Sequence, residues 1–221
     1  CWRKGREIMD NIKKIYNIID EVKNASFDDV EVIYKRPIKR GDLSLALKEN
    51  PKIIGIIDGV FHQSSAVGHK EILKVIKSGV KVYGASSMGA LRASELDSLG
   101  MIGVGYVYEQ YASGKVDSDD DVAVMLDSES LEALSVPLIS MNYVFENAVS
   151  ENILTESERE ELSHIAKETY YPKRNYAQAL SESSLSDEKK AELIDFIRES
   201  EDIKKRDAVE LLNYIKTCIN D

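Results

Sequence analysis

The sequence predicts an α/β protein: a small, mainly parallel sheet flanked by helices, with a C-terminal helical subdomain. Three observations support this. Up to about residue 100, short apolar segments alternate with amphipathic ones, the pattern of strand–helix–strand units joined by right-handed crossovers. From Pro137 onward only helical patterns occur. The length of 221 residues suits one large domain with a helical appendage.

The composition narrows the class of protein. Hydrophobic residues make up 43% of the chain and the net charge is −10, so we expect a globular protein that is no general binder of nucleic acid. Cys1 and Cys218 are the only cysteines, which predicts no disulfide framework and a reducing, cytoplasmic compartment. No apolar run approaches the roughly 20 residues of a membrane span, so no membrane partner is expected.

The first hundred residues supply the elements of the sheet. Isoleucines at steps of three and four predict an amphipathic helix over 6–23, and a β-branched run predicts a strand over 30–34. A loop with four cations follows, which suits either an acidic partner or plain solvation. Asp42 stands where it would cap a helix over 43–49.

Two further strand–helix units follow. Residues 52–57 and 80–84 are short and apolar and predict central strands; helices are predicted over 69–78 and 88–98. Asp58 comes directly after the first of these strands, at the carboxyl edge where open α/β sheets bind ligands. It either lines a site or forms a turn.

The second half reads as a bundle of helices. Thr155 and Glu158 form a capping box that begins a helix ending near residue 169, and two further helices are predicted over 186–199 and 202–218. The predicted organisation is therefore an N-terminal amphipathic helix (1–28), an α/β core (29–126) and a helical subdomain packed on the core (127–221).

The stretch Ala85-Ser86-Ser87-Met88-Gly89 joins the strand 80–84 to the helix 88–98. Small residues allow a sharp strand-to-helix turn, the geometry of a nucleophile elbow. Such a turn would push the Ser87 hydroxyl outward, near unpaired N–H groups of the first helical turn that would hold an oxyanion. A helix cap or an anion-binding site would explain the same serines. On the motif alone, we rank these two interpretations ahead of a nucleophile.

An activated serine needs a proton acceptor. Lys70 lies in the first turn of the helix 69–78, where the positive end of the helix dipole disfavours an ammonium. The opposing interpretation is a solvated face, because Lys70, Lys74 and Lys77 are spaced four and three apart. His69 is the rival base, or a structural residue at the helix start.

No cofactor or metal is expected. Gly100-x-x-Gly103-x-Gly105 has the reverse order of a dinucleotide-binding fingerprint. The acidic run that begins at Asp117 resembles a calcium loop, but Val122 replaces the required glycine and Ser128 the required glutamate. The three histidines lack the spacing of zinc ligands.

Long motifs then identify the chain as similar to the TfuA family. They cover about residues 35–125, whereas the C-terminal half is similar only in its helical character and at Arg174, Lys205, Arg206 and Ala208. The N-terminal helix departs from the first strand expected in the family. The motifs are Arg36-Pro37-x-x-Arg40-Gly41-Asp42-Leu43, Asp58-Gly59-Val60-Phe61, His69-Lys70-Glu71-Ile72-Leu73, Gly84-Ala85-Ser86-Ser87-Met88-Gly89-Ala90-Leu91-Arg92-Ala93-x-Glu95-Leu96, Gly100-Met101-x-Gly103-Val104-Gly105 and Asp119-Asp120-Asp121-Val122-Ala123-Val124, with Asp121 where Glu is expected.

The resemblance implies a partner of a YcaO enzyme in peptide-backbone thioamidation. TfuA proteins are associated with hydrolysing the thiocarboxylated C-terminus of a ThiS-like ubiquitin-fold carrier, which releases sulfide. Carried over by motif, the nucleophile is Ser87, with Ser86 less favoured, and the base is Lys70. Backbone N–H groups around Met88 would hold the oxyanion, and Arg92 either assists the anionic substrate or pairs with Glu95.

A second function is a non-catalytic adaptor that binds the YcaO enzyme and its peptide. A buried Lys70 within hydrogen-bond reach of Ser87 would favour the hydrolase. A solvated Lys70, with Ser87 bonded only as a helix cap, would favour the adaptor.

Overall fold

A computed structural model describes residues 32–61, 65–125, 127 and 133–220 of the chain. The predicted helix 6–23 lies outside these residues. The chain divides into two compact units. We call residues 32–117 with 203–220 the sheet unit and residues 118–202 the helical unit, and describe each by itself.

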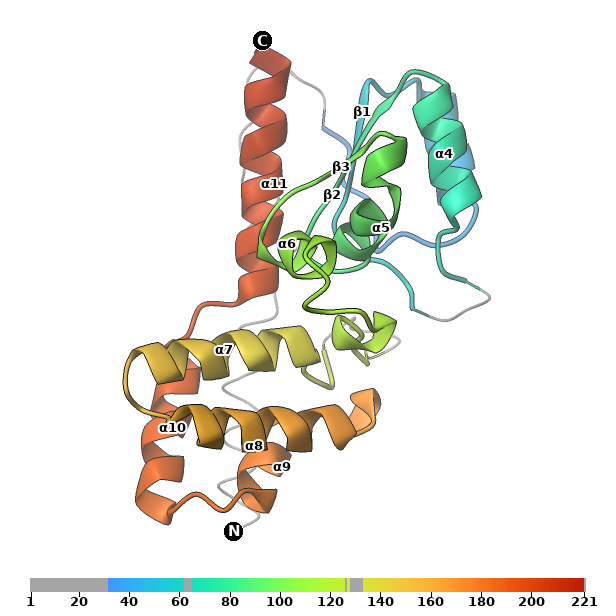
Figure 1. Cartoon of the computed structure of the whole chain (residues 1–221). Helices are drawn as coiled ribbons and strands as arrows, with labels where there is room; N and C mark the ends of the chain where they lie inside the picture. The colour runs from blue at the N-terminus through green and yellow to red at the C-terminus, as the bar shows by residue number, and fades with distance from the viewer. Residues whose placement is uncertain (1–31, 62–64, 126, 128–132, 221) are drawn as a thin grey trace. The chain divides into compact units, whose positions relative to one another are not determined.

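The sheet unit is built on three parallel strands in the order β1-β2-β3. Ile54 of β1 stands opposite Val82 of β2, which in turn stands opposite Met101 of β3. The helices α4 and α5 provide the crossovers between the strands (Figure 1). The predicted fold class is therefore confirmed. The strands are β1 (Ile53–Ile56), β2 (Lys81–Gly84) and β3 (Met101–Gly103).

Helices cover both faces of this sheet. Gly55 and Tyr83 share one face, where Tyr83 packs with Leu211 and Ile215 of α11 in one apolar cluster. On the opposite face Gly84 approaches the backbone of α5 at Gly89. The helical elements of the unit are α3 (Asp42–Ala46), η2 (Leu47–Glu49), α4 (His69–Lys77), α5 (Met88–Leu96), η3 (Asp97–Leu99), α6 (Tyr106–Ala112) and α11 (Ile203–Asn220).

Three local predictions for this unit are wrong. Residues 32–34 form no strand and are exposed, because no described residue buries the β-branched side chains of Val32 and Ile33. Ile38 instead makes an isolated parallel bridge with Gly59. Asp42 accepts a hydrogen bond from the backbone of Lys39 and caps no helix. Finally, β3 and α6 occupy a glycine- and tyrosine-rich stretch for which the sequence predicted no element.

The helical unit has its own apolar core. The capping box at the start of α8 is confirmed: the Thr155 hydroxyl accepts from the Glu158 N–H, and the Glu158 carboxylate accepts from the Thr155 N–H. A bond from Lys189 together with the Thr155 bonds lowers the pKa of Glu158 to about 2. The elements are η4 (Asp119–Asp121), α7 (Leu138–Ser150), α8 (Glu156–Glu168), η5 (Tyr171–Lys173), α9 (Tyr176–Glu182) and α10 (Asp187–Glu199).

One buried cation organises this unit. Arg174 is 1% exposed. Its guanidinium donates to the carbonyl of Ala166 at the end of α8 and to both the carbonyl and the carboxylate of Asp120 in η4. Arg174 thus fixes the acidic run through Asp120. These charge-assisted bonds compensate for the burial of the guanidinium.

The helix α11 belongs by its contacts to the sheet unit, although the sequence analysis assigned 202–218 to the helical subdomain. The domain boundaries at residues 28 and 126 remain a prediction. Within the part of the chain that the structure describes, every helix is too short or too polar to cross a membrane.

Candidate functional site

The serine turn, residues 85–88, links β2 to α5 at the carboxyl edge of the sheet. Ser86 has φ +70°, a left-handed conformation that costs a non-glycine residue about 1 kcal/mol or more. Ser87 follows with φ −133° and ψ −117° at the N-cap position of α5. The backbone therefore makes the sharp, strained turn that the sequence predicted, and the strain falls on Ser86.

Hydrogen bonds to β1 hold the turn in place. Ala85 N–H donates to the carbonyl of Ile56 at 3.1 Å, and the N–H groups of Ser87 and Gly89 both donate to the carbonyl of Ile57 at 3.2 Å. The start of α5 is thereby fixed against the end of the neighbouring strand. This close approach requires glycine at position 89, where a Cβ would lie 1.8 Å from the Ile56 carbonyl oxygen.

Both serine side chains are buried without a partner. Ser86 is 1% and Ser87 0% exposed. The prediction that the turn pushes the Ser87 hydroxyl outward is therefore wrong, because the turn packs against the end of β1 through its bonds to Ile56 and Ile57. Neither hydroxyl makes a hydrogen bond with any described residue, and Ser87 makes no side-chain cap bond. A buried polar group without a partner costs about 1–3 kcal/mol. Two of them on one strained turn indicate a functional site, since the capping interpretation supplies no bond that would offset this cost.

The first N–H of α5 is available beside these hydroxyls. Among the described residues no group accepts from the Met88 N–H, as expected for the start of a helix. It therefore remains free to stabilise an anion that forms at the serine turn.

Lys70 lies on the first turn of α4 and is exposed. Within the described chain its amine bonds neither serine. The hydrolase interpretation predicted a buried Lys70 within hydrogen-bond reach of Ser87, and the structure does not show this arrangement. The adaptor expectation of a capping Ser87 is not met either.

A polar cluster ties α5 to the start of α4. Arg92 is 9% exposed and donates through Nε to the carbonyl of Val67 at 3.1 Å. Its Nη1 lies 2.6 Å from Glu95 Oε2, which also bonds His69 Nε2 at 2.7 Å. Glu95 therefore neutralises Arg92 and occupies His69, so both residues position α4 against α5 in this structure.

Asp58 acts locally as a turn former. Its carboxylate accepts from the Gly59 N–H at 2.9 Å, while its carbonyl accepts from the Ile38 N–H at 2.9 Å. Ile38 and Met88 both pack against Gly59, where a Cβ would lie within 3.0 Å of each. The cationic segment 35–40 is thus brought to the same sheet edge as the serine turn.

Glu71 fixes that segment from α4, a role the sequence analysis missed. Its carboxylate accepts from the N–H groups of Gly41 at 2.9 Å and Leu43 at 3.2 Å, which satisfies the start of α3. Gly41 has φ +94°, a conformation that favours glycine. A glycine that begins a short helix needs an acceptor from elsewhere, but the sequence does not show that Glu71 supplies it.

Asp207 is a second positioning residue that the sequence analysis missed. It is fully buried on α11 and accepts from the N–H groups of Tyr106 and Val107, at 3.0 and 2.8 Å, at the start of α6. Burial raises the pKa of Asp207 to about 6, although the two backbone bonds act in the opposite direction. This carboxyl group connects α11 to the segment that follows β3.

The raised pKa predicts a pH-dependent stability. Because the fold favours the protonated acid, the contribution of Asp207 is fully present below about pH 4 and is lost as the pH rises through about 6. Relative to Asp207→Asn, the wild-type free energy of unfolding should therefore fall by about 3 kcal/mol over this range. Urea unfolding of both proteins between pH 4 and 7 measures this; a constant difference would contradict it.

Groups of three or more metal-ligating side chains are absent from the described residues. The candidate site at the carboxyl edge of this α/β protein consists of two buried serines and a free helix N–H. The family model described as TfuA-like protein matches residues 58–175, more than half of the chain. The chain belongs to the TfuA-like family. No curated protein matches it.

The matched span contains the serine turn, α4, β3 and Arg174. The motif at 36–43, which we also found similar to the family, precedes it. Its contacts with Gly59 and Glu71 nevertheless attach it to the matched part of the sheet unit.

Proposed function

We propose that the protein acts with a YcaO enzyme in peptide-backbone thioamidation, and that it releases sulfide from a thiocarboxylated ThiS-like carrier protein. The observation that carries the proposal is the pair of buried, unpartnered serine hydroxyls on the strained turn before α5. Membership in the TfuA-like family supports the association with a YcaO enzyme.

Because Ser87 is 0% exposed, the proposed reaction requires that docking of the carrier opens the serine turn. The Ser87 oxygen then attacks the carbonyl carbon of the carrier's terminal thiocarboxylate. The carbon–sulfur bond breaks, sulfide leaves, and the carrier remains as an ester of the serine. The Met88 N–H would hold the oxyanion of each tetrahedral intermediate. Water then hydrolyses the ester and gives the carrier with an ordinary carboxylate. The left-handed backbone of Ser86 supports that residue as the alternative nucleophile.

Lys70 is proposed as the base that takes the serine proton. Its amine is exposed in the free protein, and a docked protein substrate would cover it. Removal from water favours the neutral amine over the ammonium, which is the form that accepts a proton. The base would thus be completed by substrate binding.

A second candidate function is a non-catalytic adaptor that binds the YcaO enzyme and its peptide at the sheet edge. The exposure of Lys70, with no bond to either serine, favours this alternative. It leaves the two buried hydroxyls without a role, which is why we rank it second.

The test is sulfide release from a thiocarboxylated ThiS-like carrier, followed with and without the protein. The hydrolase predicts release at least about a hundredfold faster than the spontaneous rate, and strong loss of it in Lys70→Ala. An adaptor would leave the spontaneous rate unchanged and would instead tighten peptide binding by the YcaO enzyme.

A further inference from the structure

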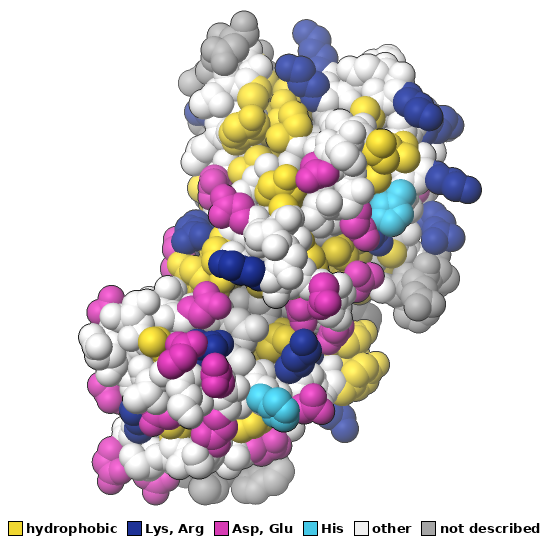
Figure 2. Space-filling view, in the orientation of Figure 1, with side chains coloured by type: hydrophobic (Ala, Val, Ile, Leu, Met, Phe, Trp, Pro, Cys, Tyr) yellow, Lys and Arg dark blue, Asp and Glu magenta, His cyan; other side chains and the backbone are white. Residues whose placement is uncertain are grey.

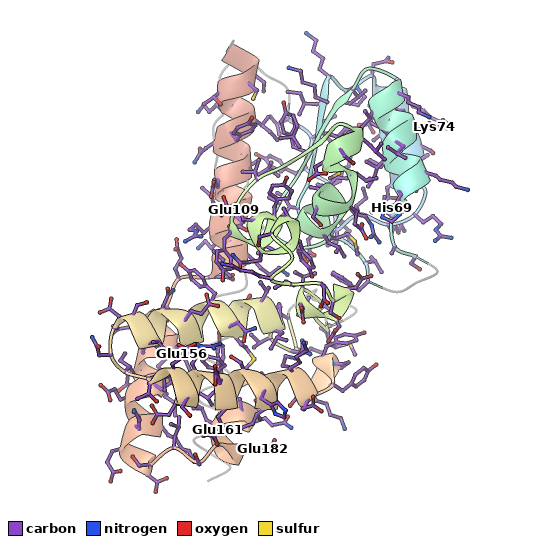
Figure 3. The ribbon with its side chains drawn as sticks, in the orientation of Figure 1. His69, Lys74, Glu109, Glu156, Glu161 and Glu182 are labelled. Atoms are coloured by element: carbon purple, nitrogen blue, oxygen red, sulfur yellow. The ribbon has the colours of Figure 1, made fainter. Side chains whose placement is uncertain are left out.

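Four exposed cations lie on two elements of the sheet unit, the segment 35–40 and the helix α4: Arg36, Lys39, Lys70 and Lys74, which we call the cationic rim. Arg36 and Lys39 lie on the segment that Ile38 attaches beside Gly59. Lys70 and Lys74 lie on α4, whose Glu71 bonds the start of α3. Lys74 projects outward from α4, away from the strands (Figure 3).

The acids near the rim are already engaged. Asp42 accepts from the Lys39 backbone, Glu71 from Gly41 and Leu43, and Glu95 from Arg92. The side chains of the rim, in contrast, have no ion pair or hydrogen bond with any described residue. The rim therefore offers four cations that pair with no described acid and are available to an acidic partner.

The charge is segregated along the chain. Residues 32–117 contain 12 Lys and Arg against 8 Asp and Glu, whereas residues 118–202 contain 7 against 21. Figure 2 shows dark-blue side chains along the side of the sheet unit formed by α4, and many magenta side chains over the helical unit. The net charge of −10 disfavours a nucleic acid as the partner of the rim.

We propose that the cationic rim docks an acidic face of a folded protein, the carrier whose C-terminal tail enters the serine turn. The identity of that carrier rests on the proposed function. The rim would steer the carrier toward the edge and orient it, and the docked surface would cover Lys70. A peptide tail alone would leave Lys74 and Arg36 without a function.

The test uses the full chain and the carrier in its carboxylate form, so that binding is measured without chemistry. The variant Lys39→Glu/Lys74→Glu reverses two rim charges. We expect about tenfold weaker carrier binding by fluorescence anisotropy at low salt, and a wild-type Kd that rises with salt concentration. The matched control Lys167→Glu/Lys173→Glu makes the same charge change on exposed residues of the helical unit and should bind within about twofold of wild type.

With the thiocarboxylated carrier, the rim variant should raise KM about tenfold and leave kcat within about twofold. Carrier binding equal to wild type in the rim variant, or equal losses in the control, would overturn the proposal. So would an oligonucleotide that binds the rim more tightly than the carrier. If sulfide is never released yet carrier binding is lost on charge reversal, the proposed hydrolysis fails and the docking surface stands.

Discussion

Replacing Ser87 with alanine is expected to reduce sulfide release from the thiocarboxylated carrier by at least about a thousandfold, because the proposed nucleophile is lost. The same substitution should leave thermal stability unchanged or raise it. The Ser87 hydroxyl is buried and makes no hydrogen bond to a described residue, so its removal eliminates an unsatisfied polar group. Loss of activity with retained stability is typical of a residue kept for function.

Ser94→Ala is the matched control on the same helix. The Ser94 hydroxyl donates to the carbonyl of Leu91, so alanine should cost a little stability and leave sulfide release within about twofold. Ser86→Ala separates the two candidate nucleophiles. If Ser86→Ala loses the activity and Ser87→Ala retains it, the assignment to Ser87 is wrong and the strained residue is the nucleophile.

Gly89→Ala should have the largest effect on stability. A Cβ at this position would lie 1.8 Å from the Ile56 carbonyl oxygen and 2.6 Å from its carbon, both of them backbone atoms of β1. The helix α5 would have to move away from the strand, and the hydrogen bond from Gly89 N–H to Ile57 would be lost. We expect a loss of about 3 kcal/mol in the free energy of unfolding, together with loss of sulfide release.

Gly68→Ala is the control for that substitution. Gly68 has φ −92°, and a Cβ there meets no described atom within 4 Å. Alanine should stabilise the protein by about 0.5 kcal/mol, because it lowers the conformational entropy of the unfolded chain. Urea unfolding measures both variants, and a Gly89→Ala protein as stable as Gly68→Ala would show that the turn tolerates a side chain.

Much of the sheet unit could be predicted from the sequence. The runs 52–57 and 80–84 are apolar and short, and Gly79 and Gly100 end the helices between the strands, both with positive φ. The strand-to-helix turn at Ser86 and Ser87 was predicted because small residues stand where an apolar run changes to a helix-forming one. These signals are local, so they do not depend on distant contacts.

The two positioning residues that were missed depend on partners far along the chain. Glu71 and Asp207 each bond the N-terminus of another helix, 28 to 30 residues away for Glu71 and 100 or 101 for Asp207. A helix begun by a glycine gives no sign of which acid will satisfy it. The exposed run at 32–34 is the opposite case: its β-branched residues predicted a strand, but no described residue pairs with it.

The central claim is that a serine of the turn forms an ester with the carrier. The most direct measurement is mass spectrometry of the reaction quenched in acid from a few milliseconds onward, followed by digestion. We expect an adduct equal to the protein plus the thiocarboxylated carrier minus hydrogen sulfide, located on Ser87 within the tryptic peptide 82–92. Sulfide release with that peptide unmodified at every time point would contradict the account.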